Sequence, residues 1–200
     1  MHLVNEDFRL RTDTLAYNTE TETATFLKPT QIIAQEDPDT LYTQGGWYRT
    51  AQRELFLHTH PWGVDSAYIM AADTLYYADS TEQGWAHCNV RLWRRDGSRY
   101  SYGDYATFHR GLSRVKLTQD PYLIEMGGDD TLIILADTLA GEEDSLAQRH
   151  LYAWPHARLR SREMQGRADS LHYFLADSQI TFVGDPVLWS GANQLTGDTI

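Results

Sequence analysis

The sequence predicts an all-β protein in which short antiparallel strands form repeated, hairpin-like units that stack on one another. Three observations support this fold class: an Asp-containing phrase recurs, apolar residues alternate with polar ones, and turn signals separate the alternating segments. No stretch carries the apolar stripe of period 3.6 that marks a helix of about a dozen residues. A single unit cannot bury its apolar face alone, so the units are expected to stack.

The recurring phrase begins with a small residue and Asp, as in "ADTLYYADS" from Ala72 and "ADSLHYFLADS" from Ala168. It returns every 26 to 34 residues, a spacing typical of repeat architectures. We expect a tight corner at each Asp, whose carboxylate accepts backbone N–H bonds, before the next strand begins. Calcium-binding β-rolls also repeat Asp, but their glycine-rich nonapeptides are absent. The markers are Asp13, Asp39, Asp73, Asp104, Asp137, Asp169 and Asp198.

The alternation is clearest in "GWAHCNVRLW", residues 84–93. Successive side chains of a strand point to opposite faces, so this segment predicts one apolar and one mostly polar face. The same period extends from Leu171 through Tyr173 and Leu175, and after a short turn to Ile180 and Phe182. The six prolines fall at strand ends or edges, where a missing N–H is harmless.

Composition excludes several classes of protein. Hydrophobic residues are 42% and charged residues 22% of the chain, which is ordinary globular composition rather than disorder. The net charge of −11 argues against a nucleic-acid partner, which needs a basic surface. No apolar run approaches the roughly 20 residues that span a bilayer.

Residues 1–200 are expected to form a single domain, because no linker or change of composition divides them. "MHLVNEDFRL" has neither the basic start nor the apolar segment of a signal peptide. The final "GDTI" opens another unit of the repeat. We therefore expect the chain to be a fragment of a longer protein.

Candidate reactive and metal-binding groups are few. Cys88 is the only cysteine, and its neighbour His87 should point to the opposite face, so Cys88 is interpreted as a small buried hydrophobe. His58 and His60 would share one face of a strand and form half of a zinc site, but no further ligand completes it, and surface histidines are favoured. Glutamates are too scattered for a glycosidase pair to be chosen; they include Glu54, Glu82, Glu125 and Glu163.

Aromatic residues are abundant, with six Trp and twelve Tyr. By the alternation, four tryptophans lie on or near outward faces. They would form either a sugar-stacking platform or an interface, unless a β-bulge shifts the phase and places some of them in the core. These residues are Trp85, Trp93, Trp154 and Trp189.

Several phrases in one order carry a family resemblance from about Leu10 to the last residue: the "TDTLAYNTET" opening, "GGWYRT", "ADTLYYADSTEQGWAHCNVRLW" and "DPVLWSGANQLTGDTI". They resemble OstA-like proteins of Bacteroidetes-type bacteria, in the LptA-type lipopolysaccharide-transport family. The resemblance implies an elongated β-jelly-roll shaped like a taco shell, a periplasmic location, and no enzymatic activity or cofactor. It also implies an apolar interior that holds lipid A, and ends that pair edge to edge with other jelly-roll domains of a transport bridge.

The alternation and the resemblance together give candidate positions for a lipid-binding groove, although for any single one of these residues an ordinary packed core is the favoured interpretation. An acidic chain is poorly matched to the phosphates of lipid A, so capture would rest on apolar contacts. The candidates are Leu75, Tyr77, Ala86, Cys88, Val90, Leu92, Phe108, Val115, Leu117, Leu171, Tyr173, Leu175, Ile180 and Phe182.

The leading hypothesis is a non-enzymatic envelope protein that binds the lipid A part of lipopolysaccharide and bridges its transport to the outer membrane. A second hypothesis is a structural module whose edge strands pair with partner domains, or with copies of itself, without carrying lipid. A carbohydrate-binding or carbohydrate-cleaving repeat protein is the third.

Overall fold

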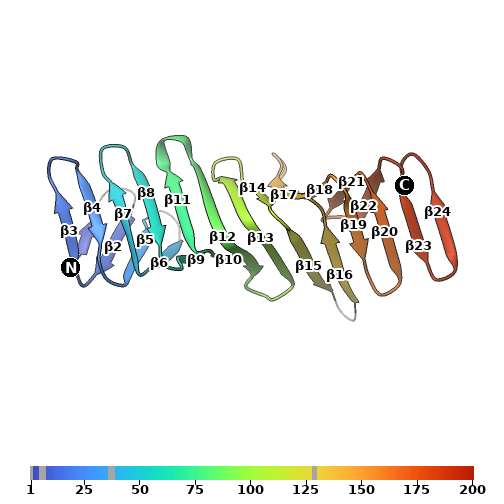
Figure 1. The fold of residues 1–200 in the computed structure, drawn as a ribbon, viewed down its shortest axis with the longest axis horizontal. Helices are drawn as coiled ribbons and strands as arrows, with labels where there is room; N and C mark the ends of the chain where they lie inside the picture. Colours follow the sequence, from blue (N-terminus) through green and yellow to red (C-terminus); the bar gives the residue numbers. More distant parts are fainter. Residues whose placement is uncertain (1, 5–7, 36–38, 128–129) are drawn as a thin grey trace. The chain divides into compact units, whose positions relative to one another are not determined.

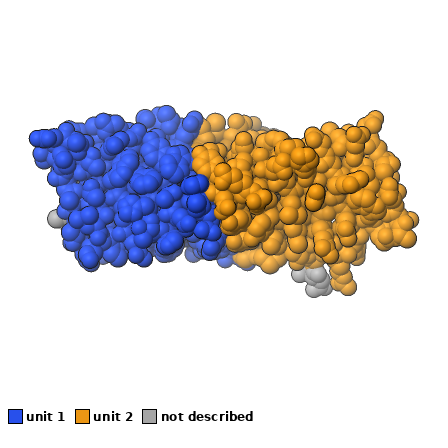
Figure 2. Space-filling model, in the orientation of Figure 1, with its two compact units in different colours: residues 1–96 blue, residues 97–200 orange. Residues whose placement is uncertain are grey.

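The computed structural model describes residues 2–4, 8–35, 39–127 and 130–200. The chain forms two compact units, residues 1–96 and 97–200 (Figure 2). Antiparallel strands contain 66% of the described residues, whose only helical element is one 3-10 turn, η1 (Asp79–Thr81). No helix in this part of the chain is long and apolar enough to cross a membrane. The predicted all-β fold is confirmed.

Each unit contains twelve described strands (Figure 1). Those of unit 1 are β1 (His2–Val4), β2 (Phe8–Thr12), β3 (Leu15–Asn18), β4 (Thr23–Phe26), β5 (Thr30–Ala34), β6 (Thr40–Thr43), β7 (Gly45–Arg49), β8 (Glu54–His58), β9 (Trp62–Val64), β10 (Tyr68–Ala71), β11 (Thr74–Ala78) and β12 (Gln83–Arg94). Those of unit 2 are β13 (Arg99–His109), β14 (Arg114–Thr118), β15 (Tyr122–Gly127), β16 (Asp130–Leu135), β17 (Thr138–Glu143), β18 (Arg149–Trp154), β19 (Ala157–Arg160), β20 (Met164–Ala168), β21 (Ser170–Phe174), β22 (Gln179–Val183), β23 (Val187–Ser190) and β24 (Asn193–Thr196).

Hydrogen bonding sorts the strands of each unit into two sheets, here called sheet A and sheet B. In unit 1, sheet A has the order β3-β4-β7-β8-β11-β12 and sheet B the order β1-β2-β5-β6-β9-β10-β12. In unit 2, sheet A has the order β13-β14-β17-β18-β21-β22 and sheet B the order β13-β15-β16-β19-β20-β23-β24. Thus β12 and β13 each bend and contribute one half to each sheet of their own unit.

The chain makes a hairpin within one sheet, crosses to the other sheet at a corner, and repeats. The predicted Asp corners occur where the chain passes from sheet B to sheet A, with one exception. Asp39 lies in the connection between β5 and β6, both in sheet B, and Gln44 occupies the corner between β6 and β7. With Gln44 in place of Asp39, the markers are 29 to 33 residues apart, so the true period is more regular than the predicted one.

Hydrogen bonds join successive corners of a unit. The backbone N–H of Asp73 donates to the Cys88 carbonyl at 2.9 Å, and that of Asp104 donates to the Gln119 carbonyl at 3.0 Å. The Asp73 carboxylate was expected to accept backbone N–H groups, but instead it lies 3.0 Å from Nδ1 of His60 and accepts a bond from Nδ2 of Asn89 at 2.9 Å. Side chains as well as backbone therefore connect the corners.

Proline marks most corners in the opposite direction, from sheet A to sheet B. Pro61 and Pro121 are fully buried there, and each follows a residue with positive φ, His60 (55°) and Asp120 (56°). Pro fixes its own φ and lacks an N–H, so it can end one strand's pairing without leaving a donor unsatisfied. The sixth proline, Pro38, lies outside the described residues. The corner prolines are Pro29, Pro61, Pro121, Pro155 and Pro186.

Candidate functional site

The faces that the two sheets of a unit turn toward each other carry the apolar side chains. In unit 1 the Phe8 ring of sheet B meets the Tyr48 ring of sheet A edge-on, with centroids 4.8 Å apart. In unit 2 a Cβ atom added to Gly166 of sheet B would lie 2.9 Å from Cζ of Phe182 in sheet A. The space between the sheets is thus the interior of each unit.

Inward side chains form rows across the strands, as the registers of sheet A in unit 2 show. The row nearest the corners is buried throughout, and consists of Ala106, Leu117, Leu139, Ala153, Leu171 and Phe182. The next row toward the hairpins is partly accessible, and consists of Phe108, Val115, Gly141, Leu151, Tyr173 and Ile180. Within this row Phe108, Val115, Gly141 and Ile180 are half-buried. The interior is therefore closed at the corner side, and its partly accessible apolar surface lies toward the hairpins.

The predicted groove residues fall into two groups, because Leu75 to Leu92 belong to unit 1 and Phe108 to Phe182 to unit 2. Half-buried members are Tyr77, Cys88, Leu92, Phe108, Val115, Leu175 and Ile180. Buried members are Leu75, Ala86, Val90, Leu117, Leu171, Tyr173 and Phe182.

Two predicted groove residues lie outside the regular inward rows. Leu175 follows the end of β21, in the turn. Cys88 lies at the bend of β12, where it and Asn89 both have positive φ (60° and 53°). The same bend brings Sγ of Cys88 to 3.6 Å from Nδ1 of His87, so the prediction that these side chains diverge was wrong. Cys88 is half-buried rather than the buried core residue that alternation suggested.

Alternation did not identify the inward residues of sheet B in unit 2. They form one row, Leu123, Ile134, Leu159, Gly166 and Leu188. In "TLIILA" apolar residues occupy both faces of β16, so the alternation does not show which of them point inward. The buried residues of β19, Ala157 and Leu159, do alternate with Arg158 and Arg160 and could have been found.

A polar cluster interrupts the apolar interior of unit 2. Arg99 and Glu125 face each other on β13 and β15, with Nη2 of Arg99 2.9 Å from Oε1 of Glu125, and both side chains are largely covered. Tyr173 approaches from sheet A. Its burial, and then the neighbouring Glu125 carboxylate, raise the pKa of the Tyr173 phenol above its ordinary value. Tyr173 therefore faces an ion pair as well as apolar neighbours.

The expectation that His58 and His60 share one face of a strand was wrong. His58 ends β8, whereas His60 lies beyond it in the corner, where Thr59 and His60 both have positive φ. Nδ1 of His58 is 2.9 Å from Oγ1 of Thr59, and His60 pairs with Asp73. Among the residues that the structure describes, no group of three or more His, Cys, Asp or Glu side chains could hold a metal ion.

The registers place the four predicted tryptophans on outward faces. Trp85 is half-buried and stacks on Tyr76, with ring centroids 5.6 Å apart. This pair follows the inward pair of Leu75 and Ala86 in the register, so it points to the other face of the sheet. Trp93 and Trp189 are also half-buried, and Trp154 is exposed. Whether these rings form a platform or an interface stays a prediction.

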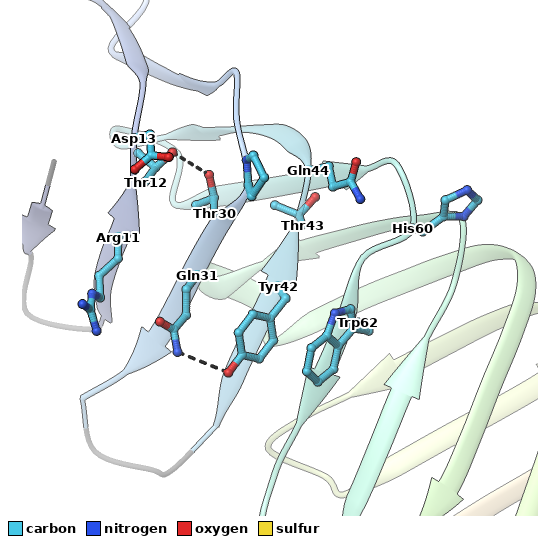
Figure 3. Close-up of a pocket in the computed structure, with 11 residues that line it drawn as sticks. Arg11, Thr12, Asp13, Thr30, Gln31, Tyr42, Thr43, Gln44, His60 and Trp62 are labelled. Carbon is cyan, nitrogen blue, oxygen red and sulfur yellow. Dashed lines mark hydrogen bonds between the residues drawn. The ribbon is translucent and has the colours of Figure 1, made fainter.

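A depression of about 600 Å³ lies on the outward side of sheet B in unit 1 (Figure 3). Tyr42 and Trp62 stand side by side on β6 and β9, stacked with ring centroids 4.1 Å apart. Nε2 of Gln31 donates to the Tyr42 hydroxyl at 3.2 Å, and Arg11 and His60 lie at the rim. This depression is outside the interior, and alternation did not predict it, because Tyr42 and Trp62 fall in short strands.

Two histidines meet on the outward face of sheet A in unit 2. Nδ1 of His150 is 3.0 Å from Nε2 of His172, and Nε2 of His150 is 3.2 Å from the Asp144 carboxylate. The His172 ring stacks on Tyr152 at 4.6 Å. Burial, and then the charge of His150, lower the pKa of His172 below its ordinary value of 6.5, against a smaller opposite effect of Glu142.

We expect acidification to destabilise the fold through His172. Its pKa is lower in the folded than in the unfolded state, so the unfolded state binds more protons as pH falls through about 6.5. The contribution is complete above that pH and is lost below it. Urea unfolding measured from pH 7.5 to 5.5 should show falling stability, with a smaller slope for His172→Gln. An unchanged slope in the variant would contradict the assignment.

Residues 114–200 match the family model described as "LptA/(LptD N-terminal domain) LPS transport protein". No curated protein matches the chain. Among solved structures, the chain is similar to LptH of Pseudomonas aeruginosa, described as the LptA homologous periplasmic component of the lipopolysaccharide transport device. The TM-score is 0.53 with 11% identity, over 65% of this chain and 93% of that chain, which establishes the fold alone.

Both comparisons support the resemblance predicted from the sequence: residues 114–200 match the LptA-type family model, and the fold is similar to that of LptH over 65% of the chain.

Proposed function

We propose that this chain takes part in lipopolysaccharide transport by holding the acyl chains of lipid A between sheets A and B. The observation that carries the proposal is the partly accessible inward row of sheet A in unit 2, where Phe108, Val115 and Ile180 are half-buried beside the closed corner row. Burial of apolar surface contributes about 25 cal/mol per Å², so acyl chains can bind there without contacts to their phosphates. The activity proposed is transport without catalysis, in the periplasm.

Edge strands support the bridging part of the proposal. Among the described residues, β24 pairs only with β23, and all four of its residues are exposed. At the other end of the chain, β3 pairs only with β4. An unpaired strand edge is a template for another strand, so domains of the same type can pair there edge to edge.

Site-specific photocrosslinking tests lipid binding. Val90 and Phe182 are too deeply buried to be suitable positions, with 0% and 1% exposure. A photoreactive residue is better placed at Val115 or Ile180, with Lys116 and Thr181 as controls, because each control follows its probe and points to the other face. In lipopolysaccharide-producing cells, we expect lipid adducts at the inward positions only.

The second candidate function is a structural module that pairs through β24 without carrying lipid, and the fully exposed β24 favours it. A probe at Gln194 on β24 would then give protein–protein adducts, while Val115 and Ile180 give no lipid adduct in well-expressed protein. That combination of results would contradict the lipid-carrying proposal and leave the edge-pairing one.

A further inference from the structure

We propose that the outward side of sheet B in unit 2 is a docking surface for the phosphate headgroups of an anionic lipid bilayer. The surface, here called the arginine face, consists of Arg158, Arg160, Arg162 and Arg167. It lies opposite the interior, so this inference does not rest on the proposed function and can hold or fail without it.

The arginine face is built by strand alternation. Arg158 and Arg160 lie on β19, and their neighbours Ala157 and Leu159 are buried in the interior. Arg167 lies on β20, next to buried Gly166, and Arg162 lies in the connection between the two strands. All four arginines are exposed, and they come from one hairpin of a chain whose net charge is −11.

Among the described residues, the side chains of these arginines differ from most others in unit 2 in forming no ion pair with a carboxylate. Arg99, Arg114 and Arg149 pair with Glu125, Glu142 and Glu143 at 2.9, 2.9 and 3.1 Å. Within the described part of the chain, no ion pair is formed by any residue of the arginine face. Moreover, Arg158 and Arg167 lie directly opposite each other on β19 and β20. Like charges at such positions are destabilising, so an external anion would relieve a repulsion that the fold leaves in place.

The surroundings of the arginine face suit phosphate at a membrane surface. Arg160 and Arg162 line a depression of about 400 Å³ together with Thr131, Ser161 and Gln165. Asp130 lies at its edge, where Oδ1 accepts the backbone N–H groups of Thr131 at 2.8 Å and Arg162 at 3.0 Å. Guanidinium groups bind phosphate oxygens in pairs, which makes arginine the preferred side chain for this contact.

Apolar and aromatic neighbours favour a bilayer over a soluble anion. Leu135, 42% exposed, is directly opposite Arg158 on β16. The guanidinium of Arg167 lies 5.7 Å from the centroid of the Trp189 ring. Tryptophan and arginine together are typical of the zone between headgroups and water. The charges are also spread along two strands, which fits an array of phosphates better than a single one.

Vesicle flotation with the whole chain tests the inference. We expect the protein to float with vesicles of phosphatidylcholine and phosphatidylglycerol but not with phosphatidylcholine alone, and binding should weaken as salt is raised. Arg158→Gln with Arg167→Gln should lower the partition coefficient about thirtyfold, from the usual contribution of about 1 kcal/mol for each basic residue near an anionic surface. The matched control, Arg91→Gln with Lys116→Gln, removes the same charge from exposed positions elsewhere and should bind like the parent.

Several outcomes would overturn the inference. Equal binding by the two double variants would show that only net charge matters, and equal binding to both kinds of vesicle would remove the role of phosphate charge. Displacement by millimolar inorganic phosphate would indicate a site for a free anion, and binding of an acidic peptide without vesicle binding would indicate a protein partner. Arg158→Lys with Arg167→Lys keeps the charge and should retain most binding, which separates docking from misfolding of the Gln variant.

Discussion

Replacing Phe182 with alanine is expected to destabilise unit 2 by about 3–5 kcal/mol, the usual cost of removing a buried aromatic side chain. Phe182 is 1% exposed, lies opposite Leu171 in the corner row of sheet A, and reaches across the interior to Gly166 of sheet B. Its removal leaves a cavity that neighbours from two sheets cannot close without moving the backbone. Urea unfolding monitored by tryptophan fluorescence measures the change in the free energy of unfolding.

The matched control is Val183→Ala, one residue further along β22. Val183 points to the outward face and is 45% exposed, so its truncation should change the free energy of unfolding by less than about 1 kcal/mol. Similar values for the two variants would mean that the inward row is not the core of unit 2.

Replacing Gly166 with valine is expected to destabilise unit 2 by about 1–3 kcal/mol through overpacking. A Cβ atom at this position would lie 2.5 Å from Cδ2 of Leu188 and 2.9 Å from Cζ of Phe182, both closer than non-bonded carbon atoms approach. Leu188 can move by rotation of its side chain, but Phe182 is enclosed between the sheets. The thermal unfolding midpoint and urea unfolding should both fall.

A double variant tests whether Gly166 and Phe182 meet across the interior. Phe182→Leu shortens the side chain that valine would strike, so the cost of Gly166→Val should be smaller in the Phe182→Leu background, with a coupling of about 0.5–3 kcal/mol. Gly127→Val is the control, because no atom of the described residues lies within 4 Å of a Cβ atom there. Strict additivity of the first pair would show that the two sheets are not in contact at this point.

How much of the fold could be predicted depended on whether a strand has one apolar face or two. In β12, alternation correctly gave Ala86 and Val90 as inward residues, because the outward ones there are mostly polar or aromatic, but it failed at Cys88 in the bend. In β16, four apolar residues in succession hide the phase, and the inward row of sheet B in unit 2 was missed. Alternation could therefore predict which residues are buried on the inward face of a strand, but it could not predict the role of the outward face.

Corners were predicted correctly where the recurring phrase contains its Asp, and one corner was missed where Gln44 takes the place of that Asp. Gln44 makes a corner without Asp, so the phrase pointed to Asp39, five residues too early. Contacts between corners, such as that of His60 with Asp73, join residues of neighbouring repeats and depend on how those repeats stack. The local sequence does not show how neighbouring repeats align, so the hydrogen-bond partners of the Asp carboxylates could not be predicted.

The bend of β12 bears on where this fold can change in length. Ala86 and Val90 are both fully buried, on either side of the two left-handed residues Cys88 and Asn89, and Val90 comes four positions after Ala86, which is an even step. One inserted or deleted residue at such a corner would move every following side chain of the strand to the opposite face of the sheet. Insertions on the hairpin side leave that parity intact. Chain growth and shrinkage in proteins of this architecture should therefore be confined to the hairpins, while the corner edge keeps a fixed count.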